Sequence, residues 1–141
     1  NLYYIFLRYA DILLMQAEAS MELGDNGAAE NSLNLVRNRA GLGDYDVNAA
    51  IISTYKETSL LGHDPLRASI YHERRVEFGL ESERFYDLVR WGDAATVFQN
   101  FDDNGQTYGK INFVTGCSEL LPIPAGDISA SNGAIEQNPC Y

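Results

Sequence analysis

Positive charge is scarce in this sequence. Its 141 residues include 10 Lys and Arg against 20 Asp and Glu, so the net charge is -10 at pH 7. No nucleic-acid partner is expected, because neutralising a phosphate backbone needs a basic surface. Long apolar runs are also lacking, and no stretch reaches the roughly 18 apolar residues that a membrane-spanning helix needs.

Cysteine and histidine are few. Cys117 and Cys140 lie outside the segments with helical periodicity; they could pair or stay free, since one bridge does not make a disulfide framework. With His63 and His72 they show no metal-ligand spacing, so no metal site is expected. Asp102-Asp103-Asn104-Gly105 is a turn, and a calcium loop is disfavoured because its acids are adjacent rather than alternating.

Catalytic motifs are lacking as well. The sequence has no glycine-rich phosphate loop, no HExxH and no serine motif of the hydrolase type. A glycoside hydrolase needs two carboxylates that flank a cleft, and the 20 acidic residues offer candidates without singling any out. We therefore expect no enzyme, no catalytic residue and no cofactor, and a glycoside hydrolase is the least favoured class.

Helical periodicity is the main pattern that is present. In residues 7–23, apolar side chains recur every three or four positions and Gly24 follows as a cap signal. Residues 28–40 repeat the pattern. The small, turn, small and large positions of a tetratricopeptide unit are matched by Ala17, Gly24, Ala29 and Leu33. We expect an all-α fold, a tetratricopeptide-like helical repeat (an α-α superhelix), that begins with a helix pair over residues 1–41.

Further helices are predicted in the middle of the chain. Asn48 could cap a helix over residues 49–58. Asp64 followed by Pro65 is a stronger start signal, because Asp is a good N-cap and Pro suits the first helical position. That helix should reach residue 79 or 80. The central charged and aromatic region, residues 64–100, also includes expected helices over residues 83–91 and 94–98.

Regular periodicity ends after residue 100. Residues 110–114 could form a short strand, and residues 120–124 must be extended because Pro122 and Pro124 exclude a helix. The apolar side chains of this segment should be buried, as a strap across the helices. We expect residues 101–141 to form an irregular, mostly extended C-terminal wrap.

Charged and aromatic residues alternate in residues 70–92. Many of these charges stand three or four positions apart, so a helix would place them on one face. We expect a largely buried ionic network rather than a catalytic pair such as Glu77 with Glu81, because pairing an acid with Arg lowers its pKa. The predicted members are Arg74, Glu77, Glu81, Arg84, Asp87 and Arg90.

Four groups of residues resemble motifs of the SusD/RagB family. In the first helix pair they are Leu7-Arg8-Tyr9-Ala10-Asp11-Ile12-Leu13-Leu14, Ala17-Glu18-Ala19 and Asn34-Leu35-Val36-Arg37. In the central stretch they are Glu73-Arg74-Arg75, Glu77-Phe78, Glu81, Arg84-Phe85, Asp87-Leu88 and Arg90-Trp91-Gly92. Near the C-terminus they are Leu120-Leu121-Pro122-Ile123-Pro124 with Asp127-Ile128, and Gln137-Asn138-Pro139 with Tyr141. At Ser82 and Cys140 the family usually has Gly.

The resemblance implies a non-catalytic lipoprotein of the nutrient uptake systems of Bacteroidetes, which take up starch and other glycans. Such a protein binds an oligosaccharide at the cell surface and delivers it to a SusC-like TonB-dependent transporter in the outer membrane. The match covers nearly all of residues 1–141 and is to the family's C-terminal portion. We therefore expect a longer chain, lipid-anchored through an N-terminal part. The alternative function is a tetratricopeptide-like scaffold that binds protein.

Candidate sugar-binding side chains stand outside the expected core. Sugars bind to aromatic faces beside amide and carboxylate groups, which exchange hydrogen bonds with the hydroxyls. The candidates are Phe101, Asn104, Gln106, Tyr108 and Asn112. The alternative for this segment is an ordinary polar surface loop, with a ligand site elsewhere in the longer protein.

Overall fold

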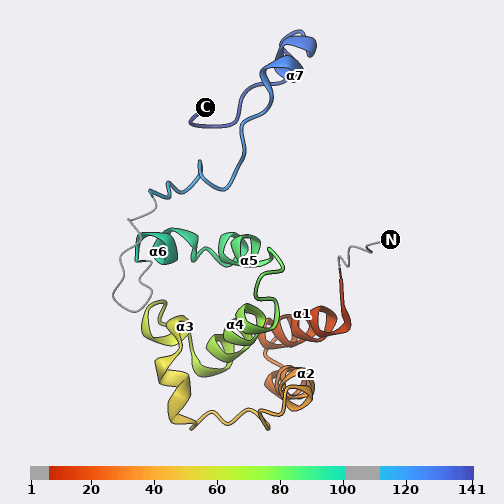
Figure 1. The fold of residues 1–141 in the computed structure, drawn as a ribbon, viewed down its shortest axis with the longest axis vertical. Helices are drawn as coiled ribbons and strands as arrows, with labels where there is room; N and C mark the ends of the chain where they lie inside the picture. The colour runs from red at the N-terminus through yellow and green to blue at the C-terminus, as the bar shows by residue number, and fades with distance from the viewer. Residues whose placement is uncertain (1–6, 101–111) are drawn as a thin grey trace. The chain divides into compact units, whose positions relative to one another are not determined.

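A computed structural model describes residues 7–100 and 112–141 (Figure 1). Within these ranges the regular structure is helical and no β-strand occurs, which confirms the all-α prediction. The chain divides into two compact units, Asn1–Arg84 and Phe85–Tyr141. The elements are α1 (Tyr9–Glu22), α2 (Asn26–Arg39), η1 (Ala50–Thr54), α3 (Lys56–Ser59), α4 (Pro65–Glu77), α5 (Arg84–Trp91), α6 (Ala94–Gln99) and α7 (Ala125–Ala130).

In the first unit, α1 and α2 form the predicted helix pair. Leu14 and Ala17 of α1 and Leu33 of α2 are completely buried. Gly24 makes the turn between the helices at φ +81°, a conformation that favours glycine. The Asp25 side chain caps α2 by accepting a hydrogen bond from the Ala28 N–H at 3.0 Å. Both helices also contact α4, and the repeat character of the pair stays a prediction.

Helix α4 begins as the sequence predicts. Pro65 is its first residue, and the Asp64 side chain accepts a hydrogen bond from the Arg67 N–H at 3.1 Å. The helix expected over residues 49–58 is wrong as a single element, because the chain forms η1 and α3 with an extended residue, Tyr55, between them. Tyr55 is buried and its ring stacks on that of His72 at 3.7 Å, which favours the break.

The second unit has its core around α5 and α6. Leu88, Ala94 and Phe113 are buried together there. The described part of the predicted strand, residues 112–114, is not a strand, and Lys110 and Ile111 lie outside the described residues. Residues 120–124 are extended, as predicted.

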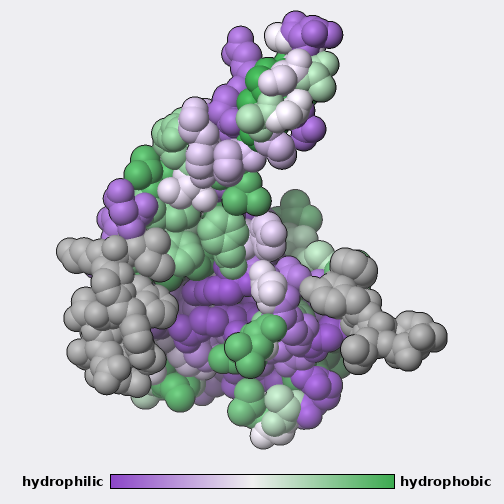
Figure 2. All heavy atoms as spheres, turned by 45° about the horizontal axis from the view of Figure 1, so that its top comes forward, coloured by the Kyte–Doolittle hydropathy of each residue, from purple (hydrophilic) through white to green (hydrophobic). Residues whose placement is uncertain are grey.

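Two details of the C-terminal segment differ from the prediction. Helix α7 follows Pro124 where only irregular structure was expected; it buries none of its residues, so no apolar stripe marks it in the sequence. The apolar side chains of the extended segment were expected to be buried, but Leu120 is 44% exposed and Leu121 is 83% exposed. Apolar residues are also visible at the surface in Figure 2, coloured green among the purple hydrophilic ones. Of the helices in the described ranges, none has the length and hydropathy to cross a bilayer.

Candidate functional site

The C-terminal end of α4 is tied to the start of α1 by arginine. Arg8 precedes α1, and its Nε and Nη2 donate to the two carboxylate oxygens of Glu81 at 3.0 and 2.9 Å. Arg8 also binds the Glu77 side chain and the Glu77 backbone carbonyl. Arg39, the last residue of α2, donates to both Glu77 oxygens at 2.6 Å. Glu77 therefore holds the ends of three helices at one point.

Two more ion pairs lie deeper in the first unit. Arg74 Nη1 donates to Asp11 Oδ1 at 2.9 Å, and both side chains are buried. Arg37 Nη1 lies 3.4 Å from Glu73 Oε2. Burial raises the pKa of the Glu73 carboxyl, and the charge of Arg37 opposes this shift only in part. With 2% of its surface exposed, Glu73 is out of reach of a substrate.

Glu57 of α3 is the most enclosed acid of this unit. Its carboxylate lies within 3.5 Å of His72, 3.4 Å of Arg75 and 3.3 Å of Arg84. Burial by itself would raise the pKa of the Glu57 carboxyl, but the nearby His72 ring and the charges of Arg75 and Arg84 hold that pKa below its usual value. Glu57 is thus an anchor for basic side chains and not a proton donor.

The structure gives the predicted network members partners that differ from those suggested by spacing. Asp87 and Arg90 do meet, with Arg90 Nε donating to Asp87 Oδ1 at 3.0 Å. The other four predicted members have partners outside residues 70–92, as the pairs above show: Arg74 with Asp11, Glu77 with Arg8 and Arg39, Glu81 with Arg8, and Arg84 with Glu57. Helical spacing reports neighbours within one helix, so it could not find these distant partners. That a single ionic network joins α4 and α5 stays a prediction.

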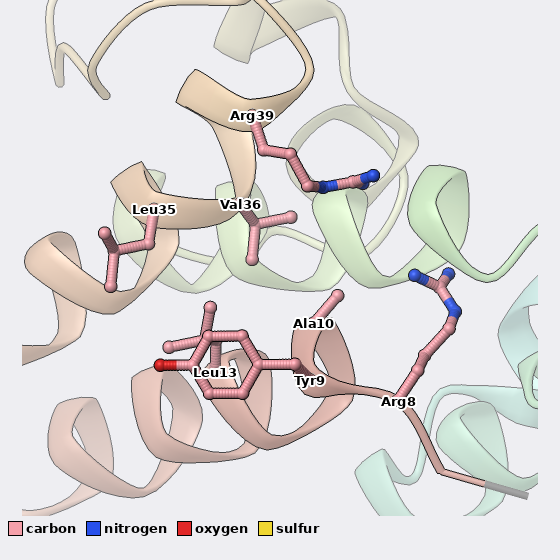
Figure 3. A pocket seen from close by; sticks show the side chains of 7 residues that line it. All are labelled: Arg8, Tyr9, Ala10, Leu13, Leu35, Val36 and Arg39. Atoms are coloured by element: carbon pink, nitrogen blue, oxygen red, sulfur yellow. The ribbon is translucent and has the colours of Figure 1, made fainter.

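An open pocket of about 350 Å³ lies between α1 and α2. Figure 3 shows an apolar floor, with the Arg8 and Arg39 side chains directed to one end, where both hold Glu77. Tyr9, which is 72% exposed, and Leu35 are at the rim. Its lining residues are Arg8, Tyr9, Ala10, Leu13, Leu35, Val36 and Arg39. The arginines are paired with acids, so the pocket suits an apolar group better than an anion.

Most of the predicted ligand-binding segment lies outside the described residues. This holds for Phe101, Asn104, Gln106 and Tyr108, while Asn112 is described and exposed. The residues that flank the segment meet: the rings of Phe98 and Phe113 stack with centroids 5.4 Å apart. Phe113 is buried against α5 and α6, so both ends of the segment are anchored on one helical core.

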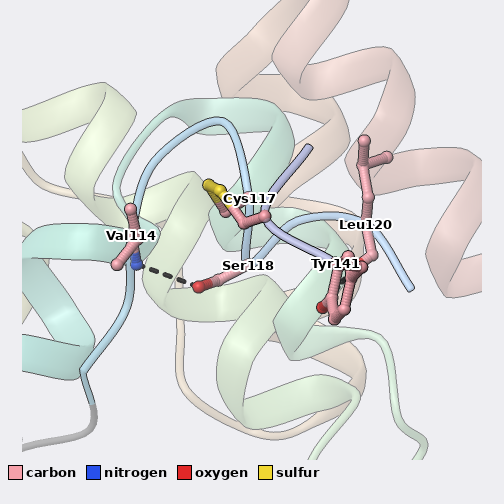
Figure 4. The surroundings of a disulfide bond; sticks show 6 residues. Val114, Cys117, Ser118, Leu120 and Tyr141 are labelled. Carbon is pink, nitrogen blue, oxygen red and sulfur yellow. Dashed lines mark hydrogen bonds between the residues drawn. A yellow bond between two sulfur atoms is a disulfide. The ribbon is translucent and has the colours of Figure 1, made fainter. Parts of the chain in front are cut away.

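The C-terminal residues form a separate small structure around a disulfide (Figure 4). Cys117 and Cys140, whose pairing the sequence leaves open, are bonded, with their Cα atoms 5.7 Å apart. Beside the bond is a shallow pocket of about 220 Å³ that Val114, Ser118 and Tyr141 also line. In the described part of the chain, no cluster of His, Cys, Asp and Glu could hold a metal ion.

Comparison with known proteins identifies the family. The model of the SusD family matches residues 1–141, and the chain belongs to that family. It is 34% identical to SusD-like protein P2 of Formosa agariphila over 139 residues, which are 98% of this chain and 26% of the relative. It is 37% identical to SusD-like protein P25 of the same organism over 136 residues, 95% of this chain and 23% of the relative. The chain thus spans about a quarter of the length of these relatives.

Proposed function

We propose that this chain is part of a surface protein that binds an oligosaccharide or related nutrient without catalysis and delivers it to a SusC-like TonB-dependent transporter. Membership of the SusD family over residues 1–141 is the observation that carries the proposal. The enclosed, arginine-paired acids Glu57 and Glu77 support a binding role over an acid–base one. The Cys117–Cys140 disulfide supports a place outside the cytoplasm, where such bonds persist. We also propose that the full-length protein is lipid-anchored in the outer membrane.

The segment between α6 and Phe113 is our proposed place of ligand contact in this chain. Its anchored ends, at the Phe98 and Phe113 stack, support this role because binding residues commonly stand on loops that a rigid scaffold positions. Tyr108 would stack on a sugar face, and the amides would exchange hydrogen bonds with hydroxyls. These amides are Asn104, Gln106 and Asn112. Phe101 would extend the aromatic surface. The affinity should be modest, because each such hydrogen bond replaces one with water.

Calorimetry of the full-length protein with a panel of oligosaccharides tests this function. Replacing Tyr108 by Ala should weaken binding about tenfold or more if its ring stacks on the sugar, which is a loss of about 1.4 kcal/mol. Tyr86→Ala is the matched control, since Tyr86 is an exposed tyrosine on α5 and should not matter. If the Tyr108 and Tyr86 variants bound the oligosaccharide with equal affinity, the segment between α6 and Phe113 would not be part of the binding site. Release of reducing ends by the parent protein would refute the non-catalytic role.

A protein-binding function is the second candidate, and the pocket between α1 and α2 favours it. Its floor is apolar and its rim carries exposed Tyr9 and Leu35, which suits an inserted apolar side chain. In the full-length protein, Leu35→Asp should then weaken the complex with the transporter. Leu23→Asp is the matched control, since Leu23 is 86% exposed and does not line the pocket. Unchanged affinity of the Leu35 variant for the transporter would exclude this pocket.

A further inference from the structure

Residues 114–141 keep a defined shape without a core of their own. None of these residues is buried, and α7 contributes no buried side chain. Apolar burial normally offsets the conformational entropy that is lost when a chain becomes ordered. Little of that stabilisation is present here, so other interactions must keep this segment in place.

Side-chain hydrogen bonds join the end of the chain to the extended segment 120–124. Gln137 acts on both sides of Ile123: its Oε1 accepts from the Ile123 N–H at 2.8 Å, and its Nε2 donates to the Ile123 carbonyl at 3.0 Å. Asn138 Nδ2 donates to the Leu121 carbonyl at 2.6 Å. The Tyr141 hydroxyl donates to the Leu120 carbonyl at 2.9 Å. We call this set of contacts the tail clasp.

The tail clasp is too exposed to hold the tail by itself. The bonds to Leu120 and Leu121 are exposed, and those between Gln137 and Ile123 are only partly buried. Water competes for donors and acceptors in such positions, so each bond contributes little net stability. Together these hydrogen bonds orient the tail on residues 120–123, but they add little to its stability.

The disulfide stabilises the folded tail more strongly than the clasp does. Cys117 and Cys140 are 23 positions apart and enclose the extended segment, α7 and Gln137 in one covalent loop. Closing a loop of this length removes much of the entropy of the open chain. Cys140, one of the two bonded residues, has φ +73°, a conformation that favours glycine. On the other side, the Ser118 hydroxyl accepts from the Val114 N–H at 2.9 Å (Figure 4).

We propose that residues 114–141 are a disulfide-dependent latch. While the Cys117–Cys140 bond is intact, the tail clasp is closed on residues 120–123. A dithiol reductant opens it: the reductant gives up two electrons and two protons, the sulfur–sulfur bond breaks, and two cysteine thiols and an oxidised dithiol result. The latch is closed in the oxidising surroundings of a cell surface and open in reducing ones. It does not depend on which ligand the protein binds.

Hydrogen exchange of the full-length protein, read by mass spectrometry with and without a dithiol at constant pH, tests the latch. On reduction, amides in residues 118–136 should exchange roughly a hundredfold faster, the order expected from opening a loop of this length. Residues 9–77 should exchange at the same rate in both states, because they belong to a different compact unit from the tail.

Three variants make the result decisive. The double variant Cys117→Ser with Cys140→Ser should exchange rapidly in residues 118–136 whether or not the dithiol is present. Gln137→Ala should accelerate exchange at Ile123 by a smaller factor and keep its response to the dithiol. Ser129→Ala removes an exposed hydrogen bond inside α7, to the Ala125 carbonyl, and should leave the response to the dithiol unchanged.

Other outcomes would overturn the proposal. Unchanged exchange on reduction would show that the clasp suffices without the bond. Acceleration over residues 9–77 as large as that over residues 118–136 would show that the bond stabilises the whole chain rather than a local latch. Two free thiols in protein secreted under oxidising conditions would also refute it, since the latch would never close.

Discussion

The buried pair of Arg74 and Asp11 offers the sharpest test of how the first unit is stabilised. The two side chains are 5% and 11% exposed, and Arg74 Nη1 lies 2.9 Å from Asp11 Oδ1. The Arg74 guanidinium also lies over the Phe78 ring, 5.0 Å from its centroid. Two replacements probe the pair: Asp11→Asn removes the negative charge at nearly constant shape, and Arg74→Met keeps an unbranched apolar stem.

Burial sets the size of the expected effect. Removing one partner of a buried ion pair leaves the other charge away from water and with less compensation, which typically costs about 3–5 kcal/mol. Each single variant should therefore lower the free energy of unfolding by about that amount. The double variant should lose less than the sum of the two, because no lone charge of the pair is left, and the coupling energy should be about 1.5–3 kcal/mol.

Urea unfolding of the parent, both single variants and the double variant measures this coupling. The pair of Arg67 and Glu22 is a matched control, since its side chains are 27% and 51% exposed. Solvent screening limits exposed pairs to about 0–1 kcal/mol, so the same cycle with Glu22→Gln should give a small value. A coupling energy at Arg74 and Asp11 no larger than that of the exposed pair would refute the argument from burial.

Three further predictions concern acid stability, the turn before α5 and the second core. The lowered pKa of Glu57 means that its contribution to stability is present above about pH 4.5, its unfolded value, and is lost as the pH falls through the lower folded value. Glu57→Gln should therefore flatten the loss of stability with acid in a series of melts, and an unchanged acid limb would contradict this. Ser82 has φ +70°, so Ser82→Gly should raise the free energy of unfolding by about 0.5–1 kcal/mol, and a lower urea midpoint would contradict the argument. Phe113→Ala should cost about 3–5 kcal/mol in the unfolding of the second unit, because its ring is buried against Leu88 and Ala94; a loss below about 1 kcal/mol would mean that the ring is not part of that core.

Local signals in the sequence predicted most of the helices. The Asp64 and Pro65 signal placed the start of α4 correctly, because capping depends on residues within one turn. Gly24 placed the turn between α1 and α2 for a similar reason. The break at Tyr55 was missed, since it is favoured by stacking on His72, a residue of another helix. The periodicity of one segment does not report its contacts with side chains of another helix.

Long-range partners were beyond sequence reasoning. Spacing within residues 70–92 could suggest partners inside that stretch alone, whereas Arg8 and Glu81 are 73 positions apart in the sequence and in contact in the structure. The sequence alone does not decide whether Cys117 and Cys140 pair, because a single pair of cysteines has no spacing pattern that indicates a disulfide framework. For the candidate ligand segment, sequence supplied residue types, and the structure added the stacked phenylalanines that anchor its ends.

The contact of Arg8 with Glu81 has a consequence for how this unit can be carried in a longer protein. Arg8 precedes the first helix and Glu81 follows α4, so the polypeptide enters and leaves the helical unit at one point. A unit with neighbouring ends can sit in a larger chain much as an inserted domain does, without stretching its host. Insertions between Glu81 and the start of α5 should consequently be tolerated better than insertions within a helix.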